Sequence, residues 1–209
     1  MKIISHRGLW YNPVEKNTES SLIESFINKL GTETDIRDFN SKLVISHDIS
    51  NQQCITIDKL FKIYSNSKYT LALNIKSDGL SDLLLEKIKE YNISDYFVFD
   101  MSIPDTLSYL KLRMNVFIRI SEFEKESELI EMASGLWVDT FSKIWYDEKT
   151  LSKYLDLNKT VCLVSPELHK RNKYELWEKL SKMKLIKNNN LILCTDEPLE
   201  AIKYFNLVI

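Results

Sequence analysis

The chain has few of the residues that make linkers and flexible loops. Its 209 residues include only four glycines and four prolines, so no stretch has the composition of a flexible linker. Apolar residues make up 44% of the sequence and charged residues 28%, which are ordinary proportions for a globular protein. A chain of this length can bury a sizeable core, and we therefore expect residues 1–209 to form a single domain.

Other absences disfavour several classes of protein. No apolar run approaches the ~20 residues of a membrane-spanning helix, and we expect the first residues to form a strand rather than a signal peptide. The net charge is −2 without a block of Lys and Arg, which gives no electrostatic basis for binding nucleic acid. The three cysteines lack the spacing of a metal site. We therefore expect a cytoplasmic protein without a membrane span and without a nucleic-acid partner.

Strand-like and helix-like segments alternate along the chain. Strands are predicted at about residues 2–5, 31–37, 69–76, 96–100, 115–120, 135–139, 160–164 and 191–194, and helices at about residues 18–30, from 56, 80–91, 104–113, 123–133, 147–155, 172–183 and 198–205. This alternation predicts a compact (β/α)₈ TIM barrel with a small hairpin after the second strand. The alternative is an open doubly wound sheet, but the chain has no glycine-rich dinucleotide-binding turn.

The richest group of polar residues lies at positions 31–48. This stretch reads as a strand, a five-residue polar turn at 38–42 and a returning strand. Glu33 and Asp35 are two positions apart in the first strand, so both carboxylates leave the same face. A hard divalent cation between them would relieve their repulsion. The turn would place His47 roughly opposite Glu33, although an exposed hairpin with solvated charges explains the spacing alone equally well.

The N-terminal quarter contains further motifs in a defined order. The first strand ends in H-R-G at positions 6–8, and N-T follows at 17–18, E-x-D at 33–35 and H-D at 47–48. In this order the motifs resemble the glycerophosphodiester phosphodiesterase family, within the superfamily of phosphatidylinositol-specific phospholipase C-like phosphodiesterases. From Asp78 onward we find no family motif of comparable strength.

The resemblance implies roles for four residues in the chemistry of a phosphodiester. His6 and His47 would form the acid/base pair, because the pKa of an imidazole near neutrality suits proton transfer. Arg7 can bind the phosphate through its forked guanidinium, and Lys76 can add a point charge. The alternative for the two histidines is that they only satisfy polar groups of the core.

The resemblance also implies a divalent cofactor, Mg²⁺ or Ca²⁺, held by Glu33 and Asp35. The family's E-x-K motif on the third strand appears here as N-I-K at positions 74–76, so the third metal ligand would be Asn74. Its amide oxygen carries no charge, which should weaken metal binding. The family's P-E-N-T also departs, to V-E-K-N-T, and these departures predict a divergent branch.

A second polar loop, at positions 164–171, follows the predicted seventh strand. It contains Glu167 and His169 together with two cations, and we expect Glu167 and His169 to contact the polar head of the substrate. A solvated loop that opens a helix is an equally consistent interpretation.

The leading functional hypothesis is metal-dependent hydrolysis of a small glycerophosphodiester-like substrate by two histidines. A barrel that binds a phosphorylated ligand without catalysis is the alternative, because Asn74 replaces a carboxylate. A barrel isomerase or lyase would need neither the metal nor two histidines. The sequence does not identify the alcohol groups, the preferred metal or the oligomeric state.

Overall fold

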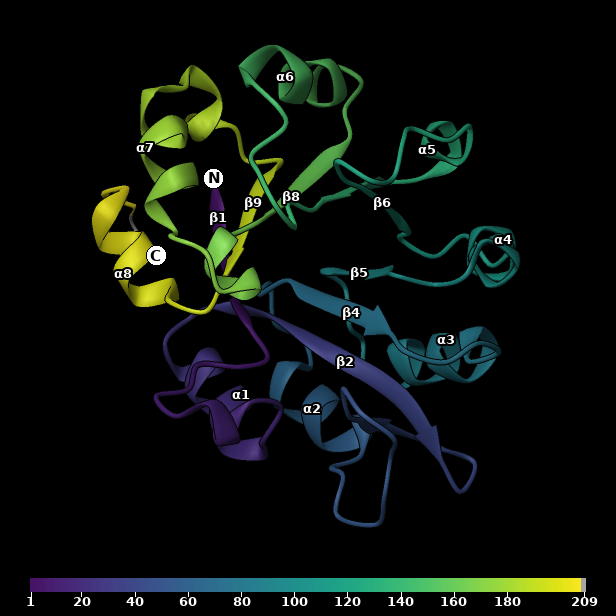
Figure 1. Cartoon of the computed structure of the whole chain (residues 1–209). Coiled ribbons are helices and arrows are strands. Elements are labelled where there is room, and N and C mark those ends of the chain that lie inside the picture. The colour runs from purple at the N-terminus through teal and green to yellow at the C-terminus, as the bar shows by residue number, and fades with distance from the viewer. Residues whose placement is uncertain (208–209) are drawn as a thin grey trace. The chain divides into compact units, whose positions relative to one another are not determined.

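The computed structural model describes residues 1–207, and the chain divides into two compact units. One unit is Ser5–Val116, and the other combines Met1–Ile4 with Phe117–Ile209. The first strand, β1 (Lys2–His6), contributes to both because the boundary falls inside it. In each unit strands alternate with helices (Figure 1).

The unit Ser5–Val116 contains the predicted motifs. After β1 its elements are η1 (Pro13–Glu15), α1 (Glu19–Ile27), β2 (Gly31–Phe39), β3 (Lys42–Ile45), α2 (Ile57–Tyr64), β4 (Leu71–Ile75), α3 (Ser81–Glu90), β5 (Tyr96–Phe99) and α4 (Ile103–Lys111). The strands are ordered β5-β4-β2-β1, and β3 pairs with β2 in antiparallel direction. All five residues of β4 are buried, as expected of a parallel strand covered on both faces.

The other unit continues the alternation. Its elements are β6 (Phe117–Ile120), α5 (Leu129–Met132), β7 (Gly135–Val138), α6 (Glu148–Asp156), β8 (Thr160–Val164), η2 (Pro166–His169), α7 (Tyr174–Lys182), η3 (Lys184–Lys187), β9 (Leu191–Thr195) and α8 (Pro198–Tyr204). The strand order is β1-β9-β8-β7-β6. A core of buried apolar side chains joins these strands to α6, α7 and α8.

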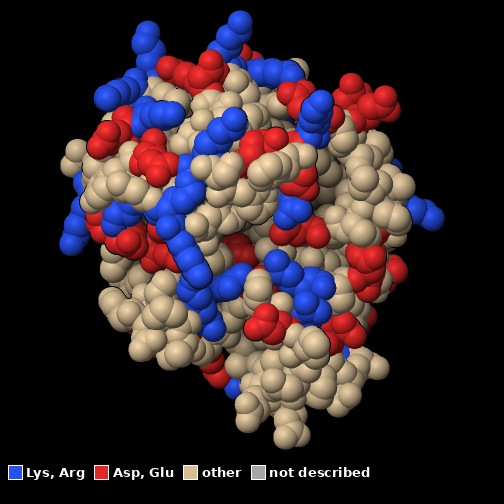
Figure 2. Space-filling model, viewed as in Figure 1, with Lys and Arg blue, Asp and Glu red and all other residues tan. Residues whose placement is uncertain are grey.

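The eight strands β1, β2 and β4 to β9, each followed by a helical segment, follow the order of a (β/α)₈ TIM barrel. This confirms the predicted fold class and the extra hairpin strand after the second barrel strand. Within residues 1–207 no helix combines the length and the apolar character that a membrane span requires. Positive and negative side chains are interspersed over the face drawn in Figure 2.

The hairpin between β2 and β3 is tighter than predicted. Phe39 pairs with Lys42, so the loop is the two residues Asn40 and Ser41 rather than five. Their φ angles are 48° and 61°, which are the positive values of a type I′ turn. Because Ile36 pairs with Ile45, continuing the register would bring position 47 level with position 34. The predicted five-residue loop is therefore wrong, and His47, which was expected roughly opposite Glu33, follows two residues after the end of β3 at Ile45.

The helix predicted at residues 123–133 is confined to α5. The preceding residues form a turn in which Ser121 and Glu124 exchange backbone hydrogen bonds. The Ser121 hydroxyl also accepts hydrogen bonds from the backbone amides of Phe123 and Glu124. A serine side chain that binds nearby backbone amides offers the chain an alternative to the helix, which explains the late helix start.

Candidate functional site

The turn after β1 holds an unusual backbone. Arg7 has φ 61°, a left-handed conformation that costs a residue with a side chain about 1–2 kcal/mol. Gly8 has φ 92°, and a Cβ there would lie 2.4 Å from Ser21 Oγ, so only glycine fits. The Arg7 amide donates a hydrogen bond to the Glu33 carbonyl at 2.9 Å. Backbone strain of this kind concentrates at functional sites, and here it turns Arg7 toward β2.

Asp35 lies at the centre of a cluster of polar side chains in this unit. Its side chain is fully buried, with Arg7 Nε 2.8 Å from Oδ2 and Lys76 Nζ 3.4 Å from Oδ1. Asn17 Nδ2 donates a hydrogen bond to Oδ2 at 2.8 Å, and Thr34 Oγ1 orients the Asn17 amide by donating to its oxygen. The structure thus brings both predicted phosphate-binding cations to one carboxylate. The role of Asn17 in orienting Asp35 was missed, although the N-T motif marked its position.

Glu33 is buried beside His6. The distance from Glu33 Oε2 to His6 Nε2 is 3.8 Å. Burial, and then the charge of Asp35, raise the pKa of Glu33 to about 8, while nearby cations and a hydrogen bond with Asn74 oppose that shift. In the absence of an added cation the protonated form of Glu33 is therefore favoured more than in an ordinary glutamate. A neutral acid in this position relieves the repulsion that two adjacent carboxylates would suffer.

The three predicted metal ligands share one property. Each presents a buried side-chain oxygen that accepts no hydrogen bond within residues 1–207, namely Glu33 Oε2, Asp35 Oδ1 and Asn74 Oδ1. Asp35 and Asn74 are direct partners in the pairing of β2 with β4. Oxygen donors without hydrogen-bond partners suit a hard cation such as Mg²⁺ or Ca²⁺. The donor set therefore fits a divalent ion.

The fit of a divalent ion to this donor set depends on the side-chain amide of Asn74. Within residues 1–207 no group of three or more His, Cys, Asp and Glu side chains could hold a metal ion, so the third donor has to be Asn74. The positive charge of Lys76 also competes with a metal ion for the carboxylates of this region. Its Nζ lies 3.4 Å from Asp35 Oδ1 and 3.9 Å from Asp100 Oδ2. Asp100 follows β5 and has φ 70°, a second departure from ordinary backbone beside the cluster.

His47 lies in a more open environment than His6. Its side chain is 49% exposed, and its Nδ1 is 2.9 Å from the carboxylate of Asp48, which is itself 93% exposed. Arg37 Nε donates a hydrogen bond to the His47 carbonyl. No hydrogen bond or ion pair within the described residues joins His47 to His6 or Glu33. Its role as the second proton carrier stays a prediction.

Glu167 belongs to the other unit, where its own neighbours occupy the carboxylate. Oε1 accepts hydrogen bonds from the Thr195 hydroxyl and from the Asp196 amide, and Oε2 accepts one from Ser165 Oγ at 2.5 Å. These contacts connect the ends of β8 and β9. Glu167 thus helps to hold the ends of these two strands together. Its contact with the substrate stays a prediction.

His169 is held by a partner that the sequence did not single out as such. His169 Nε2 is 2.6 Å from Asp139 Oδ1, and the same oxygen accepts a hydrogen bond from the Thr140 amide at 2.8 Å. Asp139 directly follows β7 and is 5% exposed, whereas the His169 side chain is 24% exposed. Only a weak signal for Asp139 is present in the sequence, because many strands end in a polar residue.

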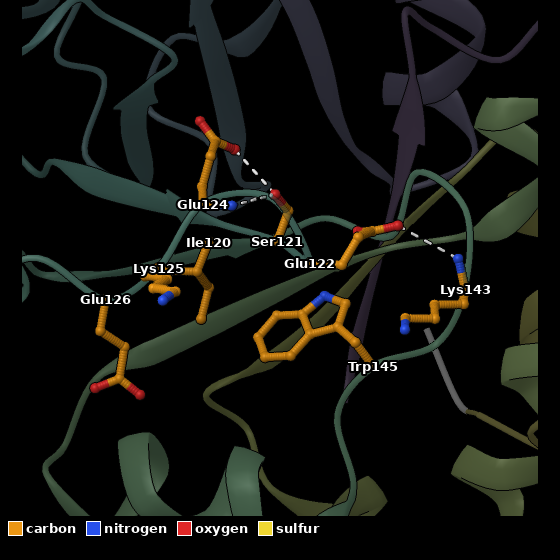
Figure 3. Close-up of a pocket in the computed structure, with 8 residues that line it drawn as sticks. All are labelled: Ile120, Ser121, Glu122, Glu124, Lys125, Glu126, Lys143 and Trp145. Atoms are coloured by element: carbon orange, nitrogen blue, oxygen red, sulfur yellow. Dashed lines mark hydrogen bonds between the residues drawn. The ribbon is translucent and has the colours of Figure 1, made fainter.

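A cavity of about 540 Å³ lies in the same unit (Figure 3). Trp145 lies among its lining residues, and its Nε1 donates a hydrogen bond to the Asp139 carbonyl at 2.7 Å. Burial alone would raise the pKa of Glu122, but hydrogen bonds from the Ser142 amide and hydroxyl help lower it to about 2. The lining residues are Ile120, Ser121, Glu122, Glu124, Lys125, Glu126, Lys143 and Trp145.

Known proteins resemble this chain in structure but not detectably in sequence. No family model matches the sequence, and no curated protein matches it. Solved structures do match. A glycerophosphodiester phosphodiesterase from Agrobacterium tumefaciens str. C58 has a TM-score of 0.72 over 99% of this chain and 100% of that chain, at 11% identity. The chain therefore has the fold of a glycerophosphodiester phosphodiesterase.

A second phosphodiesterase structure agrees with the first. A glycerophosphoryl diester phosphodiesterase from Parabacteroides distasonis ATCC 8503 matches with a TM-score of 0.69 over 98% of this chain and 86% of that chain, again at 11% identity. The predicted resemblance to glycerophosphodiester phosphodiesterases is thereby confirmed at the level of the fold. The low identity agrees with the departures in the motifs and indicates a divergent sequence.

Proposed function

We propose that the chain is a metal-dependent phosphodiesterase that hydrolyses a small glycerophosphodiester-like substrate by histidine acid–base catalysis. The observation that carries the proposal is the set of three buried oxygens, one each from Glu33, Asp35 and Asn74, that accept no hydrogen bond among the described residues. This donor set occurs beside His6 and Arg7, on a fold shared with two phosphodiesterases.

Glu33, Asp35 and Asn74 would hold the divalent ion. When bound, the ion supplies positive charge that stabilises the non-bridging oxygens of the phosphate. Asn74 keeps the site one negative charge below a three-carboxylate set, so Mg²⁺ and Ca²⁺ are expected to bind weakly. To act as a ligand Glu33 would have to lose its proton, because burial raises the pKa of this carboxyl to about 8.

Arg7 and Lys76 would bind the phosphate. Asp35 fixes the Nε edge of the Arg7 guanidinium, and the strained turn fixes its backbone. The remaining edge can then donate paired hydrogen bonds to phosphate oxygens. Lys76 adds a point charge directly after β4, and Asp35 anchors it by an ion pair of 3.4 Å.

His6 and His47 would move the protons. One imidazole takes a proton from the attacking hydroxyl or water, and the other gives a proton to the departing alcohol oxygen. The resemblance to the H-R-G and H-D motifs supports this assignment for both residues. The contact of His6 with Glu33 adds independent support for His6.

The test is turnover of a panel of phosphodiesters by the purified chain with Mg²⁺, Ca²⁺ or Mn²⁺. The proposal expects hydrolysis that a chelator abolishes and that added metal restores. Asp38→Asn is a matched control, because Asp38 is an aspartate of β2 that accepts a hydrogen bond from Ser77 outside the cluster. Hydrolysis of a phosphodiester that persists in the presence of chelator would contradict the metal requirement.

A second candidate function is binding of a phosphorylated ligand without turnover. The neutral Asn74 in place of a carboxylate favours it, together with two cations already placed on Asp35. Binding of glycerol phosphate or of a phosphodiester in calorimetry, without hydrolysis under any metal condition, would establish this candidate over the enzyme.

A further inference from the structure

We propose that Asp100 is a positioning residue that takes over the ammonium of Lys76 from Asp35 when a divalent ion binds. The inference deepens the proposed function and rests on it, because it assumes an ion on the three buried oxygens described above. All the residues concerned belong to the unit Ser5–Val116. Lys76 directly follows β4 and Asp100 directly follows β5, and these two strands pair in parallel.

The two oxygens of the Asp35 carboxylate have different surroundings. Oδ2 lies 2.8 Å from Arg7 Nε and accepts a hydrogen bond from Asn17 Nδ2 at 2.8 Å. Oδ1 lies 3.4 Å from Lys76 Nζ but accepts no hydrogen bond within residues 1–207. The contact with Lys76 is thus an ion pair without the geometry of a hydrogen bond, which makes it weaker than the contacts of Oδ2. Lys76 is therefore the cation that an incoming ion would displace.

An ion bound to Asp35 Oδ1 would lie close to the ammonium. Carboxylate oxygens bind Mg²⁺ at ~2.0–2.1 Å and Ca²⁺ at ~2.3–2.6 Å. Because Lys76 Nζ is 3.4 Å from the same oxygen, no more than about 6 Å would separate the ion from the ammonium. Two positive charges at this distance repel each other, and partial burial strengthens the repulsion. The ion therefore binds more tightly if Lys76 moves away from Oδ1.

Asp100 provides a second acceptor within a short movement of the ammonium. Its Oδ2 lies 3.9 Å from Lys76 Nζ, and its side chain is 14% exposed, so water screens its charge only in part. The Lys76 amide donates a hydrogen bond of 2.9 Å to the Ile36 carbonyl. This bond anchors the backbone, and only the flexible side chain has to move. Lys76 can thus leave Asp35 and keep an anionic partner.

The backbone of Asp100 supports a functional position. Its φ angle is 70°, in the left-handed region that residues with a side chain seldom adopt, although aspartate and asparagine tolerate it better than most. Arg7, the other cation on Asp35, has φ 61°. Strained backbone of this kind concentrates at functional sites. A need to hold the carboxylate beside Lys76 accounts for the conformation of Asp100.

Movement of Lys76 would couple metal binding to the arrangement of the site. In the metal-free chain the ammonium is a tethered cation on Asp35, and a divalent ion has to compete with it. Asp100 lowers the cost of that competition, because it receives the displaced charge. Lys76 therefore reduces the affinity for divalent ions, and Asp100 makes this reduction smaller.

The experiment is calorimetric titration with Mg²⁺ and with Ca²⁺ of the wild-type chain, Lys76→Met, Asp100→Asn and the double variant. Lys76→Met should bind each ion at least about tenfold more tightly, because a like charge near the ion is removed. Asp100→Asn should weaken binding at least about threefold more in the presence of Lys76 than in the Lys76→Met background. Asparagine tolerates the left-handed backbone, and thermal unfolding verifies that each variant is folded.

The comparison of the two backgrounds decides the inference. If Lys76 kept its place, or if Asp100 bound the ion itself, Asp100→Asn would weaken binding by an equal or larger factor in the absence of Lys76. Either result overturns the positioning role. Affinity that does not rise in Lys76→Met, or in Lys76→Gln as a second variant, also overturns it.

Lys87→Met and Asp58→Asn are matched controls. These residues form another Lys–Asp pair of the same unit, with a distance of 2.8 Å between α3 and α2, and each variant should leave the affinity within about twofold. Equal effects of the control pair would reduce the result to net charge and overturn the inference, as would the absence of binding in both the wild-type chain and Lys76→Met. If the wild-type chain binds the ion but hydrolyses no phosphodiester, the proposed function fails, and the titrations still decide the role of Asp100.

Discussion

Arg7 Nε lies 2.8 Å from Asp35 Oδ2, in a polar cluster where the Asp35 side chain is fully buried. Lys76 approaches the other oxygen of the same carboxylate. Because Arg7 and Lys76 both contact this buried carboxylate, the placement of both cations depends on Asp35.

The first prediction concerns Asp35→Asn and stability. Removing one partner of a buried ion pair leaves the other uncompensated, which costs about 3–5 kcal/mol when both are buried. Arg7 and Lys76 are each about one-fifth exposed, so we expect the lower end of that range. Urea denaturation measures the loss, with Asp38→Asn as control. A loss of less than about 1 kcal/mol would mean that solvent already screens the cations.

The second prediction concerns Glu33 and pH, with chelator present. The pKa of Glu33 is raised from 4.5 to about 8 in the folded protein, so the folded state binds more protons than the unfolded state between these values. This contribution to the free energy of unfolding therefore falls as pH rises from about 4.5 to about 8. Glu33→Gln lacks the titration, and its stability should decline less over this range. Parallel pH dependences of the two proteins would contradict the raised pKa.

The third prediction concerns the neutral ligand Asn74. Asn74→Glu adds a charged donor to a partly desolvated site and should tighten divalent binding, whereas Glu33→Gln should weaken it. Calorimetric titration with Mg²⁺ and Ca²⁺ measures both. In the wild-type chain at pH 7, binding should also release protons, since Glu33, whose pKa is raised, has to be deprotonated to act as a ligand. Unchanged affinity in both variants would move the ion away from this site.

The fourth prediction concerns His6 and His47. If they are acid and base, His6→Ala and His47→Ala should each lower kcat by about 10²–10⁴-fold while leaving the affinity for metal nearly intact. Steady-state kinetics with saturating metal measures the first effect, and calorimetry the second. Because His47 is half-exposed, its variant is the more stringent test. Near-normal turnover in His47→Ala would remove it from the mechanism.

The fold was predictable from the sequence because its signal is local and repeated. Apart from β2, each barrel strand contains a short apolar run and is followed by a helical pattern. The end of the first strand could be read from the polar residue His6, which is the last residue of β1. The spacing of Glu33 and Asp35 sufficed to place both carboxylates on one face. These inferences need only the periodicity of strands and helices.

The contacts that organise the site were harder to predict because they join distant positions. Asn17 reaches Asp35 across 18 residues, and His169 reaches Asp139 across 30. No local period encodes such pairs. The hairpin was misjudged for another reason, since the chain reverses at Asn40 and Ser41 without the glycine that usually marks a type I′ turn.

The first strand of the chain has its two neighbours in very different parts of the sequence. β1 lies between β2 and β9, and the amino group of Met1 donates a hydrogen bond to the carbonyl of Ile186. During synthesis, β2 follows β1 from the ribosome soon after it, but β9 (Leu191–Thr195) emerges much later. The strand that carries His6 therefore keeps one open edge until β9 has been synthesised. A nascent or truncated chain that stops before residue 191 exposes that edge to pairing with other chains.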